Sequence, residues 1–161
     1  MIKHNDFSDY ESALNKDGYL LQLTKGCSMM PMLRQDRDSV LIKKIYSAPI
    51  INDVILFKTK DGKYVLHRLI KKNKDGYVFR GDNNFFCEKN IANKDLIGIL
   101  EGFYRDEKFI DCKKSRGYKI YVFVNRATFI PRKMIRSVRL FLSGIKSKLK
   151  KQKNSAKREL R

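Results

Sequence analysis

A serine in an unusual setting is the first residue of this sequence that could carry chemistry. Ser28 lies in the stretch GCSMMPML (residues 26–33), where a glycine, three methionines and a proline surround one short hydroxyl. This composition is too apolar for a linker, and the proline disfavours a regular helix or strand. We therefore expect a sharply turned, fixed segment that holds the Ser28 hydroxyl in place.

Two further residues have side chains that could activate such a hydroxyl. His67 lies in the strand-like run YVLHRLI, where alternation puts it on one face with apolar neighbours. Asp82 lies in RGDNN, where Gly81 permits an unusual backbone and the aspartate projects from a turn. A neutral imidazole can take the proton of an attacking serine, and a carboxylate can fix its tautomer and stabilise the imidazolium.

Taken singly, each of these residues has an ordinary structural interpretation that is the more common one. A lone histidine in a strand is usually a satisfied core or rim residue. Ser28 can simply cap a turn, and GDNN can be a plain turn with side-chain-to-backbone hydrogen bonds. A shared site therefore requires a fold that brings the three segments together.

Short strands separated by tight turns are predicted to position these residues. Strand-like runs cover residues 19–24, 39–45, 53–59, 63–71, 76–80, 96–104 and 108–112. Asp61-Gly62 and Asp75-Gly76 lie between neighbouring runs and are typical of β-hairpin turns. Ser8 followed by Glu11 fits a capping box that opens a short helix over about residues 8–16. The sequence thus predicts a mainly β, antiparallel and partly closed fold with a short N-terminal helix.

Positive charge is concentrated towards the end of the sequence. The 161 residues have a formal net charge of +19, and Lys113 to Arg161 holds 17 Lys and Arg against one acidic residue. Apolar and basic residues alternate there at helical spacing: Met134, Ile135, Val138, Phe141, Leu142, Ile145 and Leu149 with Lys133, Arg136, Arg139, Lys146, Lys148 and Lys150. We expect a basic amphipathic helix over about residues 132–149.

The length supports one domain with an appendage. We divide it into an N-terminal helix and lead-in strand (1–23), a β domain (24–112) and a basic helix with a charged tail (113–161). The three cysteines form no CxxC pair and no Cys/His cluster has zinc spacing, so we expect reduced thiols and neither metal nor cofactor. No apolar run suits a signal peptide or a membrane span.

An ordered set of motifs resembles the signal peptidase I superfamily, which also contains the LexA-type peptidase domains. GCSMMPML is followed by Asp38–Val40, DVILFK, YVLHRLI, FRGDNN and DLIGIL, over roughly residues 24–100. The resemblance implies an antiparallel, coiled, β-barrel-like peptidase domain, in agreement with the predicted hairpins.

Position by position, the resemblance makes Ser28 the nucleophile and His67 the general base. A histidine before Arg68 is similar to the archaeal and endoplasmic-reticulum branch, whereas the bacterial housekeeping branch has a lysine there. Asp82 matches one acidic position of that branch, and Glu88 is the nearest candidate for a second. Of these two carboxylates we favour Asp82 as the support of His67.

The oxyanion hole departs from the pattern of some relatives, which have a serine two residues before the nucleophile. Gly26 occupies that position. The hole would rely on the Ser28 backbone N–H and a second donor that the sequence does not identify.

The lead hypothesis is a serine endopeptidase that cleaves a leader or precursor peptide with a Ser28–His67 dyad supported by Asp82. It predicts that Ser28 Oγ lies within hydrogen-bond reach of a His67 ring nitrogen. We expect a cytoplasmic protein that the C-terminal helix attaches peripherally to the anionic inner face of the cell membrane. Packing of that helix on the domain is the alternative for its apolar stripe. Nucleic acid is not an expected partner, because the tail lacks interleaved aromatics.

Two other functions remain open. A non-catalytic module of the same fold would use its basic tail to bind a membrane or nucleic acid, and a long Ser28–His67 separation would favour it. A self-cleaving regulator is a third option, but the chain contains no Ala-Gly bond to cut.

Overall fold

The computed structural model describes residues 9–141, 143 and 146. Its elements are α1 (Asp9–Asp17), β1 (Tyr19–Leu23), β2 (Ser39–Lys44), β3 (Val54–Lys58), β4 (Tyr64–Asn73), β5 (Gly76–Arg80), β6 (Glu88–Ile91), the short 3₁₀ helix η1 (Asn93–Asp95), β7 (Leu96–Arg105), β8 (Lys108–Asp111) and α2 (Arg116–Ala127).

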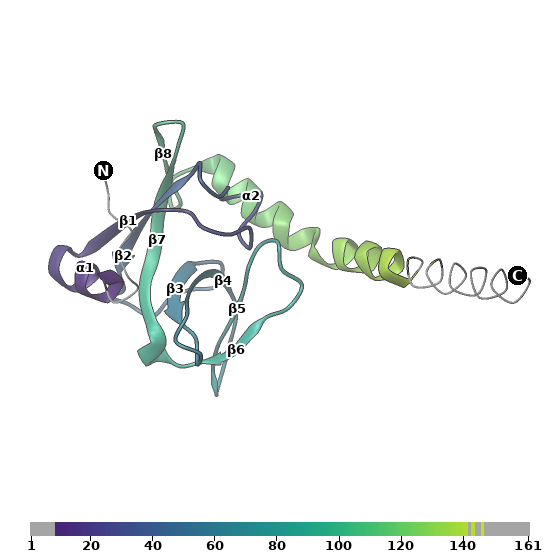
Figure 1. Cartoon of the computed structure of the whole chain (residues 1–161), viewed down its shortest axis with the longest axis horizontal. Coiled ribbons are helices and arrows are strands. Elements are labelled where there is room, and N and C mark those ends of the chain that lie inside the picture. The colour runs from purple at the N-terminus through teal and green to yellow at the C-terminus, as the bar shows by residue number, and fades with distance from the viewer. Residues whose placement is uncertain (1–8, 142, 144–145, 147–161) are drawn as a thin grey trace, which may run out of the picture. The chain divides into compact units, whose positions relative to one another are not determined.

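The eight strands of the described residues belong to one antiparallel sheet. The strand order is β1-β2-β7-β3-β4-β5-β6, and β8 pairs with β7. The long strand β7 therefore lies between β2 and β3, as Figure 1 shows. Among the described residues β1 and β6 end this path without pairing to each other, so the sheet is not closed into a barrel. The predicted mainly β, antiparallel class is confirmed.

Two hairpins flank β4, the strand that carries His67. Asp61-Gly62 and Asp75-Gly76 connect β3 to β4 and β4 to β5, as predicted. Gly62 has a φ of 77° and Gly76 a φ of 126°, values that favour glycine in such turns. Because both connections are short, β3, β4 and β5 are neighbours in sequence and in the sheet.

The core divides into two apolar clusters. The first contains Met29, Met32 and Leu33, which follow Ser28, together with buried residues of α1, β2, β3 and β7. The second is centred on Phe57 and Phe79, whose rings stack with centroids 4.5 Å apart. Met29 and Met32 are thus core residues that anchor the serine segment.

Sequence patterns missed three elements, one of which is the short helix η1. β6 begins at Glu88 and is mostly polar, and α2 begins at Arg116, well before the predicted helix at residue 132. Residues 129–141, 143 and 146 are also helical. Several residues of the sequence-based predictions lie outside the described residues. They are the capping residue Ser8, then Leu142 and Ile145, and, in the tail beyond Lys146, Lys148, Leu149 and Lys150.

The chain separates into two compact units, Met1–Val122 and Phe123–Arg161. The candidate residues Ser28, His67 and Asp82 all belong to the first unit. No helix in the described part of the chain is both long enough and apolar enough to cross a membrane.

Candidate active site

The Ser28 segment is a compact turn held from several sides. Gly26 has a φ of 77°, which lets the chain reverse just before the serine. Met29 is 5% exposed, and its carbonyl accepts the Leu33 N–H at 3.0 Å. The Thr24 hydroxyl oxygen lies 2.6 and 2.7 Å from the carbonyl oxygens of residues 34 and 38, which share its one proton, and so closes the base of the loop. The expected fixed turn is present.

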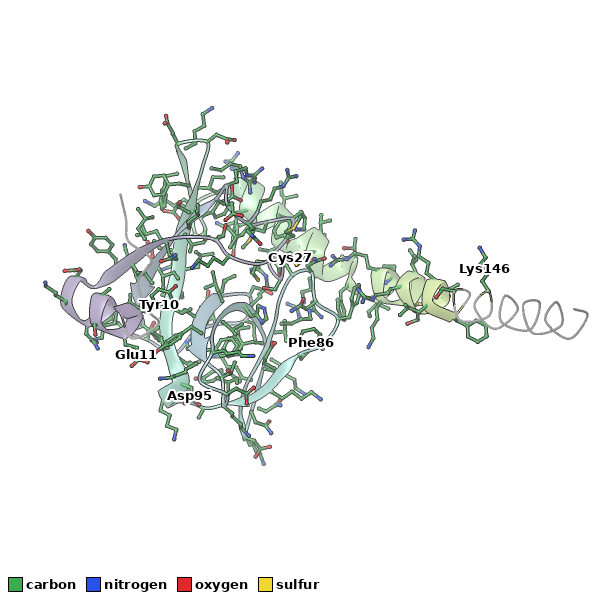
Figure 2. The ribbon with its side chains drawn as sticks, in the orientation of Figure 1. Tyr10, Glu11, Cys27, Phe86, Asp95 and Lys146 are labelled. Carbon is green, nitrogen blue, oxygen red and sulfur yellow. The ribbon has the colours of Figure 1, made fainter. Side chains whose placement is uncertain are left out.

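The RGDNN loop clamps this turn from the side. Asn83 donates its backbone N–H to the Ser28 carbonyl at 2.8 Å and its side-chain amide to the Cys27 carbonyl at 3.2 Å. Gly81 lies so close that an added Cβ would be 2.6 Å from the Ser28 carbonyl oxygen and 2.8 Å from His67 Nε2. The three segments that carry Ser28, His67 and Asp82 therefore meet at Gly81. Figure 2 marks Cys27 beside this turn and Phe86 in the loop that leads from β5 to β6.

His67 is buried on β4 and is held by one carboxylate. It lies opposite Ile55 in the sheet and is 3% exposed, with its ring edge-on to Phe57. Its Nδ1 lies 2.9 Å from an oxygen of Glu88, the first residue of β6. With Glu88 ionised, Nδ1 carries the proton and Nε2 presents a lone pair towards Gly81.

The assignment of Asp82 as the support of His67 is wrong. Both Asp82 oxygens accept hydrogen bonds from Arg68, at 2.8 and 2.6 Å, and Tyr121 donates to the same carboxylate at 3.0 Å. The reason is the alternation of β4, which puts Arg68 on the face opposite His67. An arginine that is 4% exposed needs a carboxylate, and the aspartate of the turn supplies it.

The Arg68–Asp82 pair forms a buried charged centre next to Gly81. Burial disfavours the charged guanidinium, but the hydrogen bonds and charge of Asp82 outweigh it and raise the pKa of Arg68. Tyr118 of α2 accepts from Arg68 at 3.0 Å, and burial raises the pKa of Tyr118 to about 12. This centre ties α2 to β4 and to the RGDNN loop.

Ser28, His67 and Glu88 line one pocket of about 400 Å³. Much of the remaining lining is apolar and includes Leu20, Met29, Leu33, Val40, Leu56 and Leu66. In the described part of the chain, no hydrogen bond joins Ser28 Oγ to the His67 ring, so the predicted direct contact is not formed. Ser28 is attached to a turn and its Oγ rotates about one bond, whereas the imidazole is fixed by Glu88.

Several residues of the site were not identified as such from the sequence. Asn83 and Asn84 follow Asp82 in GDNN, and the pattern gave no reason to separate the roles of the two amides. Tyr118 and Tyr121 lie at i and i+3 on α2, a spacing that could have indicated a shared face. Glu88 was a candidate, but its strand has no alternating apolar pattern that would have placed it opposite Phe79.

The arrangement of Ser28, His67 and Glu88 has the parts needed for nucleophilic catalysis: a hydroxyl, an imidazole of defined tautomer and a carboxylate that orients it. No protein-family model matches the sequence, and no curated protein matches it. The site geometry and the sequence motifs are therefore the basis for proposing a function.

Proposed function

We propose that this protein is a serine endopeptidase, similar to the signal peptidase I superfamily, that cleaves a leader or precursor peptide. The observation that carries the proposal is the 2.9 Å contact between His67 Nδ1 and Glu88. It fixes the imidazole with Nε2 directed to the region of Gly81 and Ser28, at the wall of an apolar pocket.

The reaction uses Ser28 as nucleophile and His67 as acid and base. Ser28 Oγ forms a bond to the peptide carbonyl carbon while its proton passes to His67 Nε2. The C–N bond then breaks, and His67 returns the proton to the leaving amine. Water attacks the acyl-enzyme by the same route and releases a carboxylic acid and free Ser28. Glu88 stabilises the imidazolium in both halves.

The missing direct contact is compatible with this chemistry. Catalytic hydrogen bonds are often long in the absence of substrate and shorten when it binds. A peptide in the pocket would cover Ser28 and exclude water, which favours rotation of Oγ towards Nε2.

The first test is covalent labelling with a fluorophosphonate probe, read by intact mass between pH 5 and 9. Wild type should gain one adduct, and Ser28→Ala should gain none while keeping its unfolding temperature. Equal labelling of both proteins would refute Ser28 as the nucleophile, and no adduct on wild type would refute the enzyme.

We also propose that the basic helix attaches the protein to an anionic membrane surface, at the inner face of the cell membrane. Its apolar side chains are exposed: Ile130, Met134, Ile135, Val138, Leu140 and Phe141 have exposed fractions of 53% to 70%. Arg132, Lys133, Arg136 and Arg139 lie between them in the sequence, and each basic residue near anionic lipid contributes about 1 kcal/mol. Apolar insertion and charge attraction therefore act together.

Vesicle sedimentation tests this attachment. The full chain should bind vesicles containing phosphatidylserine and leave neutral phosphatidylcholine vesicles unbound. A variant with Lys133, Arg136 and Arg139 changed to Glu should lose binding. A control variant with the exposed Lys71, Lys72 and Lys89 changed to Glu should bind more weakly by a smaller factor. Equal losses in the two variants would assign the binding to net charge and contradict a role for the helix.

A non-catalytic binding module is the second candidate function. The absence of a direct Ser28–His67 hydrogen bond among the described residues and the exposed apolar side chains of the helix favour it. It predicts that Ser28→Ala and His67→Ala leave the cellular function intact, whereas deletion of residues 132–161 abolishes it.

A further inference from the structure

The proposed acyl transfer leaves one requirement unassigned, the donors that stabilise the oxyanion. When Ser28 attacks a carbonyl, the carbonyl oxygen becomes negative and needs preorganised N–H or O–H groups. The Ser28 backbone N–H is one candidate, because within the described chain it donates to no protein acceptor. A second donor must lie close to both Ser28 and His67.

The side chain of Asn84 occupies such a position. Its Nδ2 lies 2.9 Å from the point where a Cβ on Gly81 would be, and His67 Nε2 lies 2.8 Å from the same point. The Ser28 carbonyl oxygen is 2.6 Å from it. Asn84 lines the pocket together with Ser28 and His67. Its own backbone N–H is bonded to the Gly81 carbonyl at 2.9 Å, which fixes the residue in the loop.

Two of the neighbouring donor residues are already engaged. Gly26 donates its N–H to Gln35 at 3.1 Å. Asn83 uses its backbone N–H on Ser28 and its amide on Cys27. The Asn84 amide, in contrast, has no hydrogen-bond partner among the described residues. Gln22 and Lys25 also line the pocket, from β1 and the residues that follow it, and are the rival donors.

We propose that Asn84 is a catalytic residue whose Nδ2 donates to the oxyanion formed when Ser28 attacks. This inference rests on the proposed peptidase function. It gives the two amides of GDNN different roles, because Asn83 holds the backbone of the serine turn and Asn84 faces the reacting carbonyl. It also supplies the donor that Gly26, which has no side chain, cannot.

The test measures the rate of phosphonylation by a fluorophosphonate. In that reaction the bond from Ser28 Oγ to phosphorus forms, the P–F bond breaks, fluoride leaves and the proton passes to His67. The phosphoryl oxygen accepts from the same donors as a peptide oxyanion. Asn84→Ala should lower the maximal rate of inactivation by about 10²–10³-fold, the usual effect of losing one such donor, and leave the probe's binding constant unchanged.

Three comparisons make the result decisive. Asn84→Asp, which keeps the shape but removes the donor, should lose at least as much rate as Asn84→Ala. Asn73→Ala, an exposed amide at the end of β4, should react like wild type. Gln22→Ala and Lys25→Ala test the rival donors, and each should lose less of the maximal rate than Asn84→Ala. All variants should unfold within a few degrees of wild type. A structural defect would weaken binding of the probe as well as lower the maximal rate of inactivation, whereas loss of an oxyanion donor should lower the maximal rate alone.

The outcomes separate the two proposals. If wild type gains no Ser28-dependent adduct, the peptidase function fails and the role of Asn84 fails with it. If wild type is labelled at Ser28 and Asn84→Ala reacts at the same maximal rate, only the Asn84 assignment is overturned. A loss in Gln22→Ala or Lys25→Ala, without one in Asn84→Ala, would transfer the role to that residue.

Discussion

His67 and Arg68 are adjacent in β4, point to opposite faces and bind different carboxylates. His67 contacts Glu88, whose side chain is 20% exposed, and Arg68 binds Asp82, whose side chain is 2% exposed. The buried arginine stays charged and needs a full ion pair, whereas the imidazole needs only one oriented acceptor. The two acids therefore have different roles, since Asp82 supports the fold and Glu88 supports the proposed reaction.

Substituting each acid by its amide should separate these roles. Glu88→Gln should lower the maximal rate of Ser28 phosphonylation by about 10²-fold or more, because the imidazole loses its orientation and its counter-charge. Its unfolding temperature should change little. Asp82→Asn should instead lower the free energy of unfolding by roughly 3–5 kcal/mol, because it leaves Arg68 buried without a charge partner.

Urea unfolding and labelling rates, measured on both variants, check this contrast. If Asp82→Asn were as stable as wild type and unreactive, the assignment of a structural role to Asp82 would be contradicted.

At the scale of the element, the RGDNN loop joins the serine turn to the histidine strand through Gly81. Gly81→Ala would put a methyl group within 3 Å of the Ser28 carbonyl, His67 Nε2 and Asn84 Nδ2, distances that real Cβ atoms essentially never show. We expect this variant to lose Ser28 labelling because the loop must move away.

Gly62→Ala is the matched glycine control. Gly62 lies in the β3–β4 turn, with a φ of 77° and nothing within 4 Å of an added Cβ. This change should cost stability of about 1 kcal/mol through backbone strain and leave the labelling rate unchanged. Equal labelling of Gly81→Ala and wild type would contradict the convergence of the three segments.

The elements differ in how far the sequence predicts them. The hairpins were predictable because Asp-Gly turns and alternating apolar residues act locally. β6 was not, since Glu88 and its neighbours join the sheet by pairing with β5, and that pairing depends on distant residues. The choice between Asp82 and Glu88 was equally out of reach, because it depends on which face of β4 each acid meets.

At the scale of the whole molecule, one buried acid links the serine turn to the centre of the sheet. Asp38 is 0% exposed, accepts the Arg34 N–H at 2.9 Å and is paired with Arg37 and with Arg105 of β7. Burial acts to raise the pKa of Asp38, but these hydrogen bonds and charges outweigh it and lower the pKa from 3.8 to about 2.

The sign of this shift predicts an acid-sensitive fold. Because the folded pKa lies below the unfolded value, the stabilisation is present above about pH 4 and is lost as the pH falls to about 2. We expect the urea midpoint to fall over this interval, as measured by circular dichroism. Asp38→Asn should be less stable at pH 7 and show a smaller fall. A wild-type midpoint that is constant from pH 4 to pH 2 would contradict the role of Asp38.

β6 is the last strand of the sheet order, so it can detach before the rest of the sheet unfolds. Among the residues that the structure describes, this strand ends the sheet and pairs with β5 alone, through two registered residue pairs, yet it begins with the carboxylate that orients His67. Strands at such margins open locally at a lower free energy than the sheet as a whole. In a urea titration, Ser28 reactivity should therefore vanish before the circular dichroism signal changes, and coincident midpoints would contradict this. Between the two midpoints the sheet would still be folded but Ser28 would no longer react with the probe. Loss of Ser28 labelling would therefore report the detachment of β6 alone.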